Sequence, residues 1–218
     1  AGFNLFSRAN NHSIDAGKKG VLDTIKNLKK INRSNRPLWW AGTGMKRSES
    51  TRGIRFRPPN KSFDITLFAV ATNSSPYVDS IDDPGLVKRI RRAAKSSVVL
   101  VSVHMGWEYI HIPRKKKVKK YRRLIDAGAT LIIGHHPHVV QSIERYKEGL
   151  IFYSLGNFSF GSYTTSNYYR RARMYSMIAR VTLKKKTIMR AELIPLYVGN
   201  KDPWVFQNQS IPLRFATP

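Results

Sequence analysis

Five of the six histidines lie in three short segments, and each segment follows an apolar run of strand length. The segments contain Asn11 with His12, then His104, then the sequence His-His-Pro-His at residues 135–138. Open α/β sheets place their binding sites at the carboxyl ends of strands. We therefore expect the three segments to converge on one divalent-metal site. Taken singly, each histidine would more simply be a loop or core residue.

The spacing and residue types indicate how ions would be held. His136 and His138 alternate, so on an extended backbone both imidazoles would point to one side, and Pro137 would stiffen the pair. Asn11 offers a neutral carbonyl oxygen, which suits harder ions such as Mn, Mg or Fe. His135 would allow the pair to begin one position earlier and is a weaker candidate.

Two carboxylates accompany these candidate ligands. Glu108 could orient His104 or another ligand, or it could be an exposed turn residue. Asp15 lies near the start of an expected helix, where a carboxylate complements the helix dipole. His111 follows no strand end and is not a candidate.

The apolar pattern predicts elements that would position these residues. Expected helices cover residues 16–30, 82–95 and 114–127, and residues 32–62 are expected to be loop with one short strand. Expected strands cover residues 2–7, 63–70, 97–103, 130–133, 139–146, 150–154, 174–183 and 187–197. Strand–helix alternation followed by a strand-rich end predicts one α/β domain over residues 1–218, with mixed sheets.

Composition limits the function further. The chain has 218 residues and no cysteine, which excludes thiolate ligands, and its net charge of +26 attracts polyanions of any kind. No apolar run is long enough to cross a bilayer. The chain opens inside an apolar segment without a leader, so we expect an N-terminal strand and any anchor to be missing.

Four ordered segments resemble the bacterial capsule-synthesis CapA (poly-γ-glutamate) family. They are SRANNHSIDAGKKGVLDTI, VSVHMGWEY, LIDAGATLIIGHHPHVVQSIE and LIFYSLGNFSF. The family is similar to a branch of the calcineurin-like metallophosphoesterases, and the match runs from the start of the chain to about residue 160. The resemblance implies a layered α/β/β/α sandwich with two divalent ions, which could be Mn, Fe, Mg or Zn.

The resemblance also implies individual roles. Asn11 and His104 match metal ligands, and His12 matches the catalytic histidine that protonates a leaving group. His136 and His138 match a histidine pair that serves one ion each. The Ser-Leu-Gly-Asn-Phe segment at residues 154–158 is expected to be structural, with Gly156 allowing a tight turn.

Two departures from the family pattern stand out. The Asp-x-His segment and the bridging aspartate of the superfamily do not occur, which predicts weak or incomplete metal binding. The usual His-Trp-Gly is replaced by His-Met-Gly-Trp at residues 104–107.

The function implied is capsule or poly-γ-glutamate biosynthesis at the cell envelope. The expected partners are an anionic polymer or phosphoester substrate and other capsule-synthesis membrane components. The expected location is membrane-anchored or extracytoplasmic. A metal-dependent phosphoesterase-like hydrolase activity is expected if the missing N-terminal segment is restored.

The alternatives are a non-catalytic basic module that binds polyanions and a structural protein with a decayed site. The first rests on the basic run at residues 114–123, which would more simply be a solvated helix face. No nucleic-acid fold motif is present, so specific nucleic-acid recognition is not expected.

Overall fold

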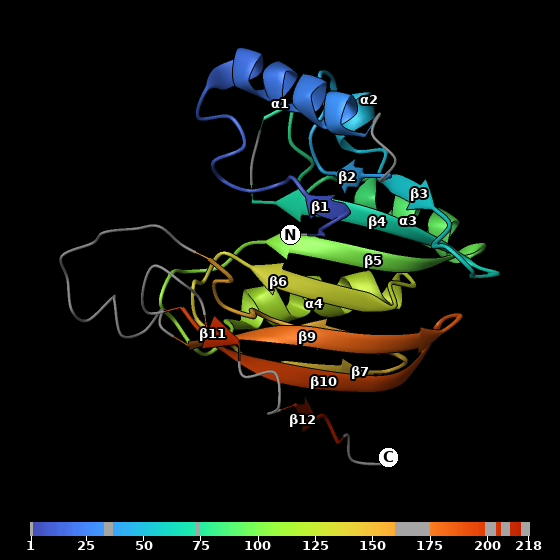
Figure 1. The fold of residues 1–218 in the computed structure, drawn as a ribbon, viewed down its shortest axis with the longest axis vertical. Helices are drawn as coiled ribbons and strands as arrows, with labels where there is room; N and C mark the ends of the chain where they lie inside the picture. Colours follow the sequence, from blue (N-terminus) through green and yellow to red (C-terminus); the bar gives the residue numbers. More distant parts are fainter. Residues whose placement is uncertain are drawn as a thin grey trace. The chain divides into compact units, whose positions relative to one another are not determined.

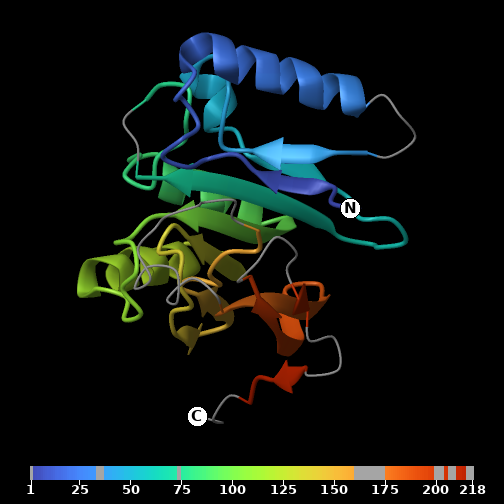
Figure 2. The same cartoon turned by 60° about the vertical axis from the view of Figure 1, so that its left-hand side comes forward.

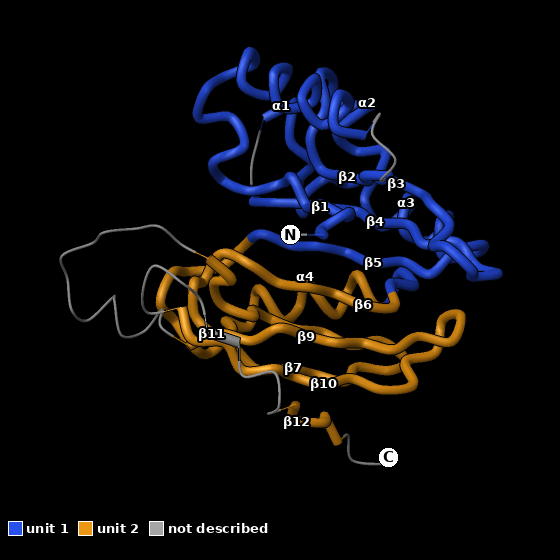
Figure 3. The backbone as a smooth tube through the Cα atoms, viewed as in Figure 1, with its two compact units in different colours: residues 1–104, 126–129 blue, residues 105–125, 130–218 orange. Residues whose placement is uncertain are grey.

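The computed structural model describes residues 2–32, 37–72, 75–159, 175–198, 204–205 and 210–214. Strands and helices alternate over the first part of the chain, and the last part is strand-rich (Figure 1). The chain separates into two compact units, one formed by residues 1–104 and 126–129 and the other by residues 105–125 and 130–218 (Figure 3). The prediction of one domain over the whole chain stays a prediction.

The first unit contains two small groups of strands with three helices. Its elements are β1 (Leu5–Ser7), α1 (Gly17–Ile31), β2 (Trp39–Ala41), α2 (Arg47–Ser50), β3 (Ile54–Phe56), β4 (Asp64–Ala71), α3 (Leu86–Ala94) and β5 (Ser97–His104). Strand β1 pairs in parallel with β2, β4 pairs in parallel with β5, and β3 is antiparallel to β4. Helix α1 lies on the side of the β1–β2 pair that faces away from β4 and β5 (Figure 2).

The described residues of the second unit form one helix and seven strands. They are α4 (Lys115–Asp126), β6 (Leu131–His135), β7 (Ile143–Tyr146), β8 (Gly149–Phe152), β9 (Tyr175–Lys184), β10 (Thr187–Tyr197), β11 (Trp204–Val205) and β12 (Ile211–Pro212). Strand β8 is parallel to β6 and antiparallel to β7, and β9 and β10 form a long antiparallel hairpin. The expected α/β class with mixed sheets is confirmed.

Most boundaries differ from the predicted ones by a few residues. The predicted start of the β9 strand at Met174 lies outside the described residues. The larger difference is in residues 32–62, where β2, α2 and β3 replace the expected loop with one strand. Elements of three or four residues are too short to show a periodicity in the sequence. The ring of Trp39 on β2 stacks on that of Phe56 on β3, with centroids 4.4 Å apart.

Two strands near the candidate ligands are almost completely buried, whereas β1, which leads to Asn11 and His12, is only partly buried. Strand β5 is buried at every position except its last, His104, and β8 is buried throughout. β-Branched residues suit such strands because they pack well on a pleated surface covered on both faces. No helix among the described residues is long and apolar enough to span a bilayer.

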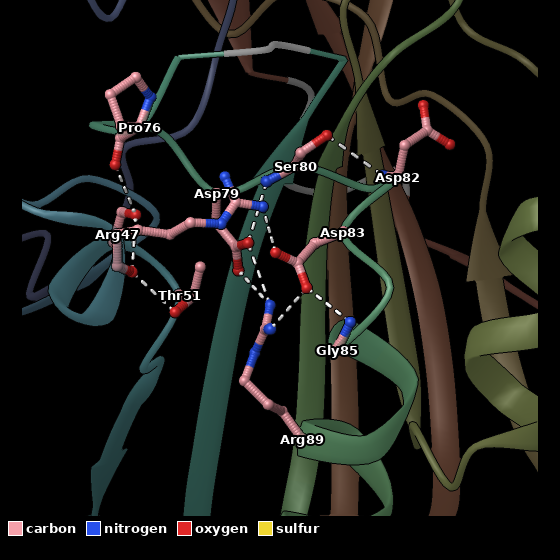
Figure 4. Close-up of polar contacts among 10 residues, drawn as sticks. Arg47, Thr51, Pro76, Asp79, Ser80, Asp82, Asp83, Gly85 and Arg89 are labelled. Carbon is pink, nitrogen blue, oxygen red and sulfur yellow. Dashed lines mark hydrogen bonds and ion pairs between the residues drawn. The ribbon is translucent and has the colours of Figure 1, made fainter.

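A buried ion network holds the loop before α3 in the first unit (Figure 4). Arg89 donates hydrogen bonds to both oxygens of Asp79, at 3.0 and 3.1 Å, and to Asp83 at 2.9 Å. Arg47 donates to the other oxygen of Asp83. Asp79 and Asp83 are only 1% and 7% exposed, so the arginines compensate two carboxylates that have lost most of their hydration.

Burial acts differently on the two carboxylates. It raises the pKa of Asp79 to about 6, because desolvation outweighs the opposing effect of Arg89. Burial also opposes ionisation of Asp83, but hydrogen bonds from Arg89, the Gly85 N–H and Arg47 together lower the pKa of Asp83. Arg89 therefore offsets only part of the desolvation cost of Asp79, whereas the three donors together keep Asp83 ionised.

Replacing Arg89 by methionine should lower the free energy of unfolding by about 3–5 kcal/mol, because buried Asp79 loses its cation and Asp83 keeps only Arg47. The loss should be larger at pH 8 than at pH 5.5. Without Arg89 the pKa of Asp79 rises further, so the folded state binds a proton that the unfolded state has released, and stability falls as pH rises through this window. Urea unfolding at the two pH values measures both effects.

Arg92→Met on the same helix is the matched control, since Arg92 is exposed. A loss below about 1 kcal/mol in Arg89→Met, or an equal loss at both pH values, would contradict the account.

Candidate metal centre

In the first unit, β1 and β5 bring together residues that are far apart in sequence. The Ser102 hydroxyl on β5 donates to the Ser7 hydroxyl at the end of β1, at 2.8 Å. The loop after β1 is then closed by Ser13, whose hydroxyl accepts from the Asn10 N–H at 2.9 Å and donates to the Arg8 carbonyl at 2.6 Å. This turn presents Asn11 and His12 beside the end of β5.

The side chains of Asp15, His12, Asn11 and His104 form one hydrogen-bonded chain. His12 Nδ1 lies 2.7 Å from Asp15 Oδ2, and His12 Nε2 lies 3.1 Å from Asn11 Nδ2. Asn11 Oδ1 in turn lies 2.8 Å from His104 Nε2. All donors and acceptors match if His12 carries its proton on Nδ1 and His104 carries its proton on Nε2.

The contact of Asn11 with His104 is an ordinary hydrogen bond, and it places an amide oxygen and an imidazole nitrogen side by side. An ion at this position would replace the hydrogen bond between the two side chains. Asn11, His12 and Asp15 are exposed, so an ion or a substrate could reach them from solvent.

The second unit contains a separate cluster made by Glu108, His136 and His138. One ligand atom from each lies within 4.8 Å of the other two. His138 Nε2 is 3.8 Å from Glu108 Oε1. Two imidazoles with one carboxylate is a donor set that Zn²⁺, Fe²⁺ and Mn²⁺ accept.

Asn157 orients one of these imidazoles. His138 Nδ1 donates to Asn157 Oδ1 at 2.8 Å, which leaves the Nε2 lone pair on the Glu108 side. Metal-binding histidines usually donate their second nitrogen to such an acceptor, because this fixes both tautomer and ring orientation. The sequence missed this role of Asn157, although the Ser-Leu-Gly-Asn-Phe segment beside the histidines was the available signal.

The backbone of this cluster is unusual. Tyr109, His136 and His138 have φ of +62°, +92° and +60°, a region that residues other than glycine seldom occupy. Each such residue costs on the order of 1–3 kcal/mol, and strained residues concentrate at functional sites. The expected extended backbone for His136 and His138 is therefore wrong. The two rings still lie near each other, with centroids 6.1 Å apart, because the left-handed turn brings them together.

Glycines allow the strand ends to approach closely. A side chain at Gly134 would place its Cβ only 2.0 Å from the Tyr153 carbonyl oxygen. Gly156 has φ of +78°, as a tight turn requires.

Each unit by itself brings some of the predicted residues together, and the convergence of all three segments on one site stays a prediction. Asn11, His12, Asp15 and His104 lie together in the first, and His136 and His138 lie together in the second. Glu108 lies beside His138 and so becomes a candidate ligand. Metal binding by these residues stays a prediction.

Comparison with known sequences places the chain in a family. Residues 1–162, more than two thirds of the chain, match the family described as bacterial capsule synthesis protein PGA_cap. The chain belongs to this capsule-synthesis family.

Two curated relatives agree with the assignment. The capsule biosynthesis protein CapA of Bacillus anthracis is 36% identical over 172 residues, covering 73% of this chain and 41% of the relative. The PGA biosynthesis protein CapA of Bacillus subtilis (strain 168) is 31% identical over 218 residues, covering 96% of this chain and 54% of the relative. The chain thus spans about half the length of the curated relatives it matches.

One solved structure can be aligned with the chain over most of its length. A hypothetical protein from Thermus thermophilus is 17% identical, with a TM-score of 0.45, covering 96% of this chain and 75% of that one.

In this family member, helix α4 of the second unit carries a buried lysine. Lys117 is 3% exposed, and its Nζ donates to Gln141 Oε1 at 2.8 Å and to the Tyr153 carbonyl at 2.7 Å. Both acceptors are neutral, so burial lowers the pKa of Lys117 to about 7. Burial and the nearby Lys117 charge also lower the pKa of His135 to about 4, which keeps this imidazole neutral at pH 7.

The free energy of unfolding should therefore rise between pH 7 and pH 10. The unfolded state keeps the Lys117 proton up to about pH 10.5, whereas the folded state releases it near pH 7, so deprotonation favours folding across this window. Relative to Lys117→Met, the protein should gain on the order of 3–4 kcal/mol from pH 7 to pH 10. Denaturant titrations at several pH values measure the gain.

Lys116→Met changes an exposed lysine on the same helix and should leave the pH profile unchanged. If the free energy of unfolding changed with pH in the same way in the protein and in Lys117→Met, Lys117 would not be desolvated in solution.

Proposed function

We propose that this chain is a metal-binding, phosphoesterase-like hydrolase domain that acts in capsule or poly-γ-glutamate biosynthesis. Family membership supports the biosynthetic role. The observation that carries the metal-dependent activity is the cluster of Glu108, His136 and His138, whose ligand atoms lie within 4.8 Å of one another. The Asn11–His104 pair, 2.8 Å apart, adds a second set of candidate ligands.

The donor chemistry of each cluster fits divalent ions. Glu108, His136 and His138 would hold one ion through a carboxylate and two imidazoles. Asn11 and His104 would supply an amide oxygen and an imidazole. A bound divalent ion supplies Lewis-acid stabilisation of negative charge on a phosphoryl oxygen.

His12 is the candidate proton donor to a leaving group. The Asp15 carboxylate accepts from its Nδ1, which orients the ring. The Nε2 atom faces Asn11 Nδ2, and both side chains are exposed, so a substrate oxygen could take the place of that contact. Asp15 acts through His12 and is a positioning residue.

An anionic polymer or a phosphoester suits the charge of the chain, because a net charge of +26 concentrates polyanions near the protein. We further propose that the domain works at the cell envelope with other capsule-synthesis membrane components, in assembly or export of the polymer.

Metal binding is tested by titrating the metal-free protein with Mn²⁺ or Zn²⁺ in a calorimeter. His136→Ala and His138→Ala should each weaken binding at least about 100-fold, because each removes a ligand of the second cluster. His104→Ala tests the first cluster in the same way. The stoichiometry shows whether the chain binds one ion or two.

His111→Ala is the matched control. His111 lies in the same loop as Glu108, but its Nδ1 donates to the Val140 carbonyl at 3.1 Å. The metal site would be overturned if the protein bound no metal. It would also be overturned if His111→Ala and His138→Ala lost metal affinity equally. Hydrolysis of generic phosphodiesters and of γ-glutamyl oligomers by the loaded protein then distinguishes the substrate classes.

Asn157→Ala should reduce metal affinity about 10–100-fold, because His138 loses the acceptor that fixes its tautomer. Asn157→Asp keeps an acceptor and should restore most of the affinity. If both variants bind equally weakly, the side chain fills space and does not orient His138.

A second candidate function is a non-catalytic polyanion-binding module. It is favoured by α4, which presents exposed basic side chains over most of its length. A gel shift with an anionic polymer separates the two functions. Binding that disappears by about 0.3 M salt and does not change in the histidine variants reflects charge alone.

A further inference from the structure

The loop between β5 and α4 exposes three large apolar side chains. Trp107, Ile110 and Ile112 are 60%, 41% and 78% exposed. Scattered exposed apolar residues are ordinary, but three within six positions of one loop form a local apolar surface. A surface of this kind is typical of an interaction site.

The loop is held in this conformation by its own backbone. The Tyr109 N–H donates to the Pro137 carbonyl at 2.8 Å, and Gln141 Nε2 donates to the Ile110 carbonyl at 2.6 Å. His111 adds its bond to Val140. The backbone polar groups therefore face the unit while the apolar side chains face solvent.

A basic helix face follows directly. The exposed cations at the start of α4 and along it are Arg114, Lys115, Lys116, Lys119, Arg122 and Arg123. The other side of the helix carries the buried residues Tyr121, Leu124 and Ile125. The Arg114 guanidinium lies 3.3 Å from the ring centre of Trp107, so the apolar loop and the basic face are continuous.

We propose that residues 107–112 and the basic face of α4 dock this protein onto a bilayer containing anionic lipids. Tryptophan and isoleucine favour the boundary between headgroups and acyl chains, and neighbouring lysines and arginines bind anionic headgroups. A hydrated polycarboxylate would use the cations but offers no partner for the apolar side chains. The combination therefore favours lipid over polymer.

Docking of this kind would bring Glu108, which lies within the loop, to the membrane surface. The docking surface uses the apolar side chains of the loop and the cations of α4, none of which is a candidate ligand, so it is independent of the metal proposal. The two proposals can therefore fail separately.

The test is co-sedimentation of the 218-residue chain with phosphatidylcholine vesicles, with and without 30% phosphatidylglycerol, in metal-free buffer at 0.1 M salt. We expect binding only to the anionic vesicles. K115E/K116E/K119E should weaken binding at least about 100-fold, since each cation near an anionic surface contributes about fivefold. Ile112→Ser should weaken binding about tenfold by removing an inserted apolar side chain.

The matched control is K184E/K185E/K186E, which makes the same change in net charge at the exposed turn between β9 and β10. It should retain most of the binding. Equal loss in the two triple variants would mean that net charge alone attracts the vesicles, and would overturn the docking surface.

Fluorescence separates lipid from polymer. Vesicles with brominated acyl chains should quench a tryptophan signal that is absent in Trp107→Phe, because Trp107 enters the acyl boundary. Binding to soluble polyglutamate with no such quenching on vesicles would assign the basic face to a polymer and overturn the lipid proposal.

Discussion

Burial of the parallel strands decides where polar chemistry can lie in this protein. A strand covered on both faces has no room for charged or strongly polar side chains within it, so these appear where the strand ends. Strand β5 is buried up to its last residue, and that residue is His104. In the second unit β6 ends at His135, immediately before His136 and His138. His104 and the pair of His136 and His138 therefore lie where the chain leaves β5 and β6.

This constraint explains why much of the site could be predicted from the sequence. The β-branched run before His104 predicts a buried strand, and the polar residues after it therefore predict a strand-end loop. The same argument applies to Leu131 and the residues after it. The α/β class follows because such strands need helices to cover them.

Other features left no periodic signal in the sequence. Backbone angles at His136 and His138 are set by the hydrogen bonds and close packing around them, and the alternation His-Pro-His suggested an extended segment instead. Asn157 takes its role from a residue 19 positions earlier, which spacing alone cannot indicate. The sequence predicted a helix starting near Asp83. It carried no sign that Asp83 and Asp79 share Arg89, because this contact depends on the path of the preceding loop.

The two clusters differ in what an ion must displace. In the first unit Asn11 and His104 already bond each other at 2.8 Å, so an ion must compensate for a hydrogen bond as well as for lost hydration. In the second unit Glu108 and His138 approach only to 3.8 Å, beyond hydrogen-bond distance, and Glu108 brings a negative charge. The positive-φ residues have already incurred their conformational cost in the folded chain, so binding there needs little further ordering. Within the second unit, the Glu108 carboxylate and the preset backbone at His136 and His138 therefore both favour a bound cation.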